Sequence, residues 1–220
     1  MSIDRVAEGV WQLTGYPHSF VNCYLVGEVL MDCATRWAKS RLLRDLRGRR
    51  LSMIALTHCH PDHQGLAKLL CETRGIPLAC HEADVPAMEG RGPMQPNNWI
   101  LRLGKRCWSG PPCPVGRVLR HGDEIAGFRI VHAPGHTPGH VMYFRDSDRV
   151  ALAGDVLANL NFLTMQEQLV EPPRIFCSDP AENRRSIAKL AELEPSLVCF
   201  GHGPPLHDTA RLRGLVRRWT

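Results

Sequence analysis

The stretch "THCHPDH", residues 57–63, places three histidines and one aspartate within six consecutive positions. The apolar run that leads into it, "LSMIALT" (51–57), predicts a buried strand that ends where the histidines begin. A single histidine is more often a hydrogen-bonded polar residue than a metal ligand. Several imidazole and carboxylate groups at the end of a strand instead indicate a metal site, because strand ends are rigid supports for functional loops.

The spacing inside this stretch suits two metal ions. His58 and His60 are two positions apart and can point the same way, whereas Asp62 and His63 are adjacent and diverge. One loop can therefore serve two neighbouring ions. Cys59 lies between the two same-facing histidines and is expected to point away, with a soft thiolate ligand as the alternative.

Similar candidates recur wherever a predicted apolar strand runs into a loop. They are His132, His136 and His140 in "HAPGHTPGH", Asp155 in "ALAGD", and His202 in "VCFGHG". Neutral imidazole and carboxylate suit zinc, iron or manganese. A carboxylate such as that of Asp155 has two oxygens and can bridge two metals about 3.5–4 Å apart, and such a pair can hold a bridging hydroxide.

The bulk properties bound the class of protein. The chain has 220 residues, of which 44% are hydrophobic, and this suits one large domain with a sizeable core. The N-terminus has no basic segment followed by an apolar run, and no apolar stretch reaches about 18 residues. Neither a secretory signal nor a membrane span is therefore expected, and the expected location is the cytoplasm.

Cysteine usage and charge give weaker indications. The nine cysteines are scattered and odd in number, which favours reduced, buried thiols. Cys107 and Cys113 in "CWSGPPC" are the nearest pair, with a second zinc site or a reversible disulfide as alternatives. The net charge is +5, and arginines cluster at 43–50 and 211–219. We expect these to be solvated helix faces, with contact to nucleic acid or an anionic substrate as the alternative.

Local patterns predict alternating strands and helices. Strands are expected within 9–32, where Gly27 suits a hairpin turn, and at 51–57, 127–133, 140–144, 149–155 and 196–200. Helices are expected at 36–47, at 64–74, from Asp179 onward, and at the end of the chain. Asp179, Pro180 and Glu182 form a helix-start signature with a capping box. Residues 86–116 hold six prolines and five glycines and are expected to form an irregular insertion that can act as a lid.

The motifs "THCHPDH", "PGHTPGH", "AGD" and "GHG" occur in this order and resemble those of the metallo-β-lactamase superfamily. The resemblance covers essentially the whole chain. It implies an α/β fold, a four-layer αββα sandwich, as a single domain over 1–220 with the metals at one edge between two sheets. "PGHTPGH" followed by the strand "VMYF" resembles the glyoxalase II-like branch.

The resemblance also implies a set of ligands. The first metal would be held by His58, His60 and His136, the second by Asp62, His63 and His202, with Asp155 bridging both. Two divalent metal ions are expected, zinc first, with iron or manganese as alternatives. A metal-bridging hydroxide would be the nucleophile, and Asp62 and Asp155 are the catalytic carboxylates. His132 and His140 have no ligand position and are expected in the core or behind the ligands.

Several functions share these motifs. The resemblance favours a dinuclear hydrolase of a small thioester, ester or lactone. Glyoxalase II has a helical C-terminal extension with basic glutathione contacts, whereas only 18 residues (203–220) follow His202 here, which speaks against a glutathione thioesterase. The alternatives are a mononuclear iron persulfide dioxygenase using His58, His136 and Asp155, a nuclease, a β-lactamase, or a non-catalytic metal-binding protein.

Substrate contacts are expected from three segments. The partner is a small molecule with apolar and aromatic pocket walls; nucleic acid and membrane are not expected, and the sequence does not predict an oligomeric state. The candidates are Tyr16, His18 and Phe20 in the loop 15–20, Met94 and Trp99 in the insertion, and Phe162 and Met165 after Asp155. Trp108 belongs to the same insertion, which is expected only as a lid.

Overall fold

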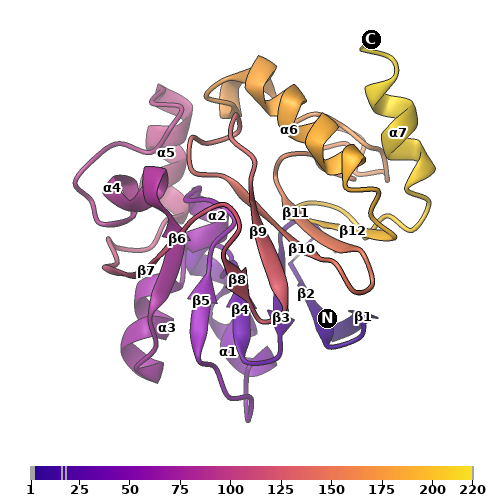
Figure 1. The fold of residues 1–220 in the computed structure, drawn as a ribbon. Coiled ribbons are helices and arrows are strands. Elements are labelled where there is room, and N and C mark those ends of the chain that lie inside the picture. Colours follow the sequence, from indigo (N-terminus) through magenta and orange to yellow (C-terminus); the bar gives the residue numbers. More distant parts are fainter. Residues whose placement is uncertain (1–2, 16, 18, 220) are drawn as a thin grey trace.

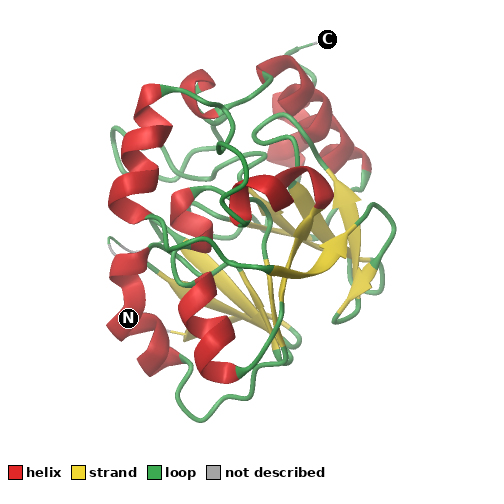
Figure 2. Ribbon diagram, turned by 90° about the vertical axis from the view of Figure 1, so that its left-hand side faces the viewer, coloured by secondary structure: helices red, strands yellow, loops and turns green. Residues whose placement is uncertain are grey.

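Two β-sheets face each other and are covered by helices on their outer sides (Figure 1). The computed structural model describes residues 3–15, 17 and 19–219. Turned by 90°, the strands form the middle of the molecule, with helices to the left and at the upper right (Figure 2). The predicted four-layer αββα sandwich is confirmed.

The first sheet has seven strands in sequence order. They are β1 (Ile3–Ala7), β2 (Val10–Thr14), β3 (Asn22–Val26), β4 (Val29–Met31), β5 (Met53–Ala55), β6 (Leu78–His81) and β7 (Val115–Leu119). β1 to β4 are antiparallel neighbours, and Gly27, with φ +56°, makes the predicted hairpin turn between β3 and β4. β4 to β7 are parallel, so the carboxyl ends of β4, β5 and β6 meet at one edge.

The second sheet has five strands in the order β12-β11-β10-β9-β8. They are β8 (Glu124–Ile125), β9 (Phe128–His132), β10 (Val141–Arg145), β11 (Val150–Gly154) and β12 (Leu197–Phe200). β11 and β12 are parallel neighbours. Asp155 and His202, which follow these two strands, therefore leave the sheet at the same edge.

Helices cover both outer faces. α1 (Lys39–Asp45) and α3 (Ala67–Arg74) pack on the first sheet, and α6 (Pro180–Glu192) and α7 (Ala210–Val216) on the second. The other helices lie in the connections: α2 (Pro61–Gln64), α4 (Val85–Met88), α5 (Trp99–Trp108), and the 3-10 turns Arg36–Ala38, Glu82–Asp84 and Arg174–Phe176. None of the helices among the described residues is long and apolar enough to cross a membrane.

Strand alternation divides the interior into three layers of core. Leu25 packs outward with α1 and α3, whereas its neighbour Tyr24 points between the sheets. In the second sheet, Ile130 and Tyr143 point between the sheets, and Val131 packs outward with α6. Side chains from both sheets thus fill the central layer.

Two tyrosines of the central layer bond to the opposite sheet just before a ligand loop. The Tyr143 hydroxyl on β10 donates to the carbonyl of Leu56, which follows β5, at 2.7 Å. The Tyr24 hydroxyl on β3 donates to the carbonyl of Phe200, the last residue of β12, at 2.8 Å. Burial raises the pKa of both hydroxyls, so they remain donors. Each sheet is therefore tied to the start of a ligand loop on the other.

The predicted helix 64–74 corresponds to α3, which begins later, at Ala67, and ends at Gly75 in the left-handed region with φ +64°; the short α2 precedes it inside the histidine loop. The insertion holds α4 and α5, and its last two residues belong to β7. The Asp179 side chain caps α6 as predicted, accepting from the N–H of Glu182 at 2.9 Å. The reciprocal half of the capping box was wrong, because Glu182 pairs with Arg185 and the Asp179 N–H donates to the carbonyl of Gly135.

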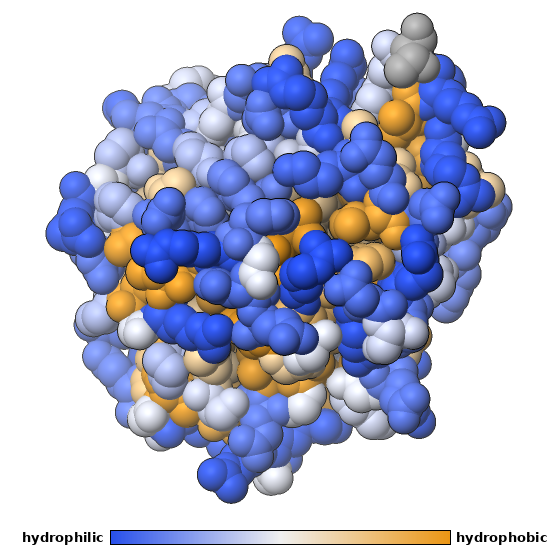
Figure 3. All heavy atoms as spheres, in the orientation of Figure 1, coloured by the Kyte–Doolittle hydropathy of each residue, from blue (hydrophilic) through white to orange (hydrophobic). Residues whose placement is uncertain are grey.

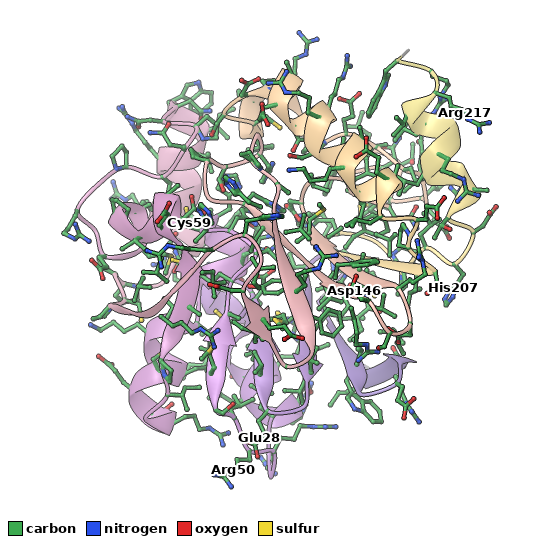
Figure 4. All side chains as sticks on the ribbon, in the orientation of Figure 1. Glu28, Arg50, Cys59, Asp146, His207 and Arg217 are labelled. Carbon is green, nitrogen blue, oxygen red and sulfur yellow. The ribbon has the colours of Figure 1, made fainter. Side chains whose placement is uncertain are left out.

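The surface is mainly hydrophilic on the face shown in Figure 3. All nine cysteines are free. In α1 and α7, Leu42, Leu212 and Leu215 are buried, whereas Arg44, Arg211 and Arg213 are exposed, as expected for solvated helix faces. Arg41 differs, because it is half-buried and donates to the Thr14 carbonyl. Arg50 pairs with Glu28 at 3.5 Å at the lower end of the first sheet, whereas Cys59 lies in the histidine loop, toward the upper end (Figure 4).

Candidate metal centre

Loops from both sheets meet at one edge of the sandwich. The first sheet contributes the loop after β5 with α2, and the second contributes the loop between β9 and β10 and the ends of β11 and β12. Their ligand atoms form three overlapping groups, each within 4.8 Å: His58, His60 and His136; His58, His63 and Asp155; Asp62, His63 and His202. These groups together contain the seven residues that the motifs point to. All are buried except Asp62, which is half-buried.

The donor atoms fit a divalent cation. Four buried atoms have no hydrogen-bond partner: Nε2 of His58, His63 and His136, and Oδ1 of Asp155. Buried polar atoms are rarely left unpaired, so a cluster of them on one point indicates a missing partner. Asp155 Oδ2 lies 3.0 Å from His202 Nε2 and 3.4 Å from His63 Nε2. Imidazole and carboxylate donors at this density are typical of zinc and related ions.

In His60, His63 and His202, a hydrogen bond to one ring nitrogen leaves the other ring nitrogen free to bind a metal. His63 Nδ1 lies 2.8 Å from Asp32 Oδ2, and His202 Nδ1 bonds to the Phe20 carbonyl, so each leaves Nε2 free. His60 is reversed, because its Nε2 lies 2.8 Å from the Gln95 carbonyl and leaves Nδ1 free. Such outer partners fix the tautomer and ring orientation of metal ligands.

Asp32 was not predicted from the sequence, although it supports two of the ligands. Its carboxylate accepts from the Thr57 N–H and the Thr57 hydroxyl, both at 2.8 Å, and from His63. The same hydroxyl lies 3.0 Å from His58 Nδ1, and because it donates to Asp32 it accepts the hydrogen bond from Nδ1–H, which leaves Nε2 of His58 free. The signal that could have found it is an apolar strand, β4, that ends in a carboxylate beside the strand carrying the histidine loop.

Asp84 is a second buried carboxylate that the sequence reasoning missed. It accepts from the Cys59 N–H at 3.1 Å, from the Thr137 hydroxyl at 3.0 Å and from the Gly139 N–H at 3.0 Å. It therefore joins the loop of His58 to the loop of His136. A Cβ at Gly139 would lie 2.5 Å from Asp84 Cγ, so glycine is required for this approach.

We expect Asp84→Asn to weaken metal binding by about 10- to 100-fold, the loss typical for an outer partner of a metal ligand. The amide keeps the volume, but its NH2 group would face an N–H or hydroxyl donor that now bonds to a carboxylate oxygen. Competition with a chromophoric chelator measures the affinity. Asp123→Asn is the matched control, because Asp123 also accepts a backbone N–H, from Arg120 at 2.8 Å, on an exposed turn. Equal affinities in the two variants would contradict this role.

The protonation of the histidines divides the cluster into two. Burial lowers the pKa of His58, His60 and His136 below the usual range, which keeps them in the neutral form that binds metal. Burial opposes protonation of His202 as well, but Asp155 and Asp62 raise its pKa to about 10. Asp155, Asp32 and Asp62 likewise raise the pKa of His63. The carboxylates of Asp155 and Asp62 thus favour positive charge next to His63 and His202, and a metal ion would supply it.

The remaining candidates lie outside the three ligand groups. His140 Nε2 accepts the Asp155 N–H at 3.0 Å and so positions the shared carboxylate. His132 donates to the Pro138 carbonyl and stacks on His81 with ring centroids 4.0 Å apart. Cys59 is buried in the core of the first sheet, and burial together with Asp84 raises the pKa of its thiol, which disfavours a thiolate ligand.

A cavity of about 450 Å³ opens onto this cluster. Phe20 and Phe162 line it as predicted contacts, with ring centroids 6.1 Å apart. Tyr16 and His18 lie outside the described residues. Its described walls come from Phe20, from α2 and α5, from the three loops of the second sheet that carry His136, Asp155 and His202, and from the segment 158–176.

Three further predicted contacts do not line the cavity. α5 presents Ile100, Gly104 and Trp108, four positions apart, to the cavity, which leaves Trp99 on the flank with 71% of its surface exposed. Met165 faces solvent, and Met94 is buried in the core of the first sheet. Trp108 is the tryptophan of the insertion that reaches the cavity.

The sequence matches a protein-family model described as the metallo-beta-lactamase superfamily over residues 16–202. The chain belongs to the metallo-β-lactamase superfamily. It is 30% identical to the probable metallo-hydrolase YflN of Bacillus subtilis (strain 168), over 89% of this chain and 79% of that protein. It is 27% identical to a hydroxyacylglutathione hydrolase (glyoxalase II) of Fuscovulum blasticum, over 71% of this chain and 50% of that enzyme.

A solved structure of the metallo-β-lactamase fold is similar over nearly the whole chain. The crystal structure of TTHA1623 in a di-iron-bound form has a TM-score of 0.70 and 30% identity, and the match covers 91% of this chain and 97% of that one. The fold and the superfamily are thereby shown.

Proposed function

We propose that this protein is a dinuclear metal-dependent hydrolase of a small thioester, ester or lactone. The observation that carries the proposal is the set of overlapping ligand groups at the edge between the sheets, with four buried donor atoms lacking partners. His58, His60 and His136 would hold one ion and Asp62, His63 and His202 the other. Asp155 would be shared, since it belongs to the group that lies between them.

The comparisons support two ions and hydrolysis. TTHA1623 is described in a di-iron-bound form, and YflN is named a probable metallo-hydrolase. Zinc is the proposed ion, with iron or manganese as alternatives, because histidine and aspartate ligands accept all three. Bound divalent ions would lower the pKa of a water molecule and polarise a substrate carbonyl oxygen.

Carboxylates of the protein would orient the attacking water molecule. Asp62 and Asp155 line the cavity beside His202, with Asp62 Oδ2 3.3 Å from His202 Nε2. Burial opposes ionisation of Asp62, but His63 and His202 lower its pKa, so it is a carboxylate that can accept a hydrogen bond from the attacking water and orient it. His140 holds the backbone of Asp155 from the other side.

Elemental analysis and activity together test the proposal. We expect about two metal ions per chain and hydrolysis of at least one member of a thioester, ester and lactone panel under argon. A mononuclear iron dioxygenase would need only His58, His136 and Asp155 and would leave Asp62, His63 and His202 without a role. One iron per chain, with oxygen uptake on glutathione persulfide and no anaerobic hydrolysis, would overturn the proposal.

A further inference from the structure

The cavity over the ligand cluster has apolar walls. α5 contributes Ile100, Leu101, Leu103 and Trp108, and Phe162 and Phe176 stand in the segment that follows Asp155. Among the residues that the structure describes, the polar ones lining the cavity are the ligands His60, Asp62, His136, Asp155 and His202, and Cys107. No described lysine or arginine lines it, so an anionic group on the substrate would find no cation inside.

The mouth of the cavity is apolar as well. Leu103 and Trp108 line it, yet they leave 55% and 49% of their surfaces in water. Large apolar side chains held in water around a cavity are typical of a surface that an apolar ligand covers. The apolar wall thus continues from the ligand cluster to solvent along one face of α5.

Gly104 keeps the middle of this wall open. It lies inside α5, where glycine is less favourable than alanine. A Cβ there would meet only Pro61 Cγ, at 3.8 Å, so alanine would fit. Since residue 104 faces the cavity, any longer side chain would extend into the space between α5 and the ligands. The glycine therefore sets the width of the cavity beside Pro61.

We infer that the substrate carries an uncharged, apolar acyl group that binds along the α5 wall, with its ester, thioester or lactone carbonyl at the ligand cluster. This rests on the proposed function for the chemical step, but the binding of the acyl group does not. Each methylene transferred from water into such a cavity can raise affinity by up to about fourfold. A carboxylate on the acyl chain would lose this gain and remain unpaired.

Binding of alcohols tests the wall without a cleavable bond. On the purified, metal-loaded protein we expect 1-octanol to bind at least tenfold more tightly than 1-butanol, measured by tryptophan fluorescence. The signal should disappear in Trp108→Phe and persist in Trp99→Phe, because Trp108 lines the cavity and Trp99 does not. Calorimetry on Trp108→Phe should still show octanol binding, since this substitution removes only the fluorescence signal.

Filling the cavity gives the matched pair of variants. Gly104→Leu should abolish the preference for octanol over butanol, whereas Arg106→Leu, on the exposed side of α5, should keep it. With 4-nitrophenyl esters we expect kcat/KM to rise at least tenfold from acetate to octanoate in the wild type, and to stay flat in Gly104→Leu. The 4-nitrophenyl ester of succinate should be poorer than that of butyrate, since the two differ only in the terminal carboxylate.

The outcomes separate this inference from the proposed function. Tighter octanol binding that is lost in Gly104→Leu, with no ester, thioester or lactone cleaved, would support the acyl-binding wall and overturn the proposed hydrolysis. Cleavage without chain-length preference, and octanol no tighter than butanol, would overturn the wall and leave the hydrolysis intact. A preference for succinate over butyrate would also overturn the wall.

Discussion

Asp155→Ala is expected to lower kcat/KM by more than about 1,000-fold, beyond the loss typical for an outer partner of a ligand, and to leave fewer than two metal ions per chain. In the proposed site this carboxylate is the group shared between the two sets of ligands. Its Oδ1 has no hydrogen-bond partner, and its Oδ2 lies 3.0 Å from His202 Nε2 and 3.4 Å from His63 Nε2. Its removal deletes the bridge and leaves histidines on both sides without their common neighbour. Metal content per chain and hydrolysis rates measure the two effects.

Asp146→Ala is the control for this substitution. Asp146 lies in the same sheet, at the hairpin between β10 and β11, and pairs with Arg129 at 3.0 Å on the surface (Figure 4). Exposed pairs of this kind contribute about 0–1 kcal/mol, so this variant should keep both its metal and its activity. Two ions and full activity in Asp155→Ala would refute the assignment of the bridge.

Gly201→Ala is expected to lower kcat/KM by at least about 100-fold, the cost of misplacing a reacting group by about 1 Å. A Cβ at this position would lie 2.1 Å from Asp155 Oδ1 and 2.6 Å from His63 Cε1. The glycine cannot retreat, because its N–H donates to the Gly154 carbonyl and its carbonyl accepts from Asn22. The added methyl group must therefore displace two ligands, and metal affinity should fall with activity.

Gly214→Ala is the matched glycine control. Gly214 lies within α7, and a Cβ there would meet nothing within 4 Å. This variant should be more stable by about 0.5–1 kcal/mol, since alanine favours the helix, with unchanged metal binding and activity. Thermal unfolding of both variants separates a local effect on the site from a general loss of fold. Normal metal affinity in Gly201→Ala would contradict this prediction, because it would mean that the backbone at residue 201 can shift far enough to accommodate the methyl group.

The site residues that could be predicted from the sequence are those that directly follow a predicted strand. Each apolar run that ends in histidine or aspartate becomes a strand, and parallel neighbours such as β11 and β12 must release Asp155 and His202 at one edge. The layered fold follows from the same alternation of strands and helices. The sequence could not predict which ring nitrogen each histidine presents to a metal. For His60 the choice depends on the Gln95 carbonyl, which belongs to an irregular segment.

What the sequence did not show depends on contacts between distant segments. Asp32 and Asp84 hold the ligand loops in place, yet no local pattern distinguishes a buried supporting carboxylate from a surface one. The place of Trp99 outside the cavity has a similar cause, since Trp99 and Trp108 stand at opposite ends of α5 and only the helix face of Trp108 meets the cavity. That choice is made by packing against α2, which composition does not reveal.

The tyrosine hydroxyls of Tyr24 and Tyr143 give the inner core a role beyond stability. Each ring spans the gap between the sheets and fixes a main-chain carbonyl next to a ligand loop. The separation of the ligand loops is therefore set by the thickness of the packed interior. A substitution that swells or shrinks this interior, at Ile130 or Leu152 for instance, would change the distances between donor atoms without touching any of them. The volume of the inner core thus helps to set the spacing of the candidate ligands.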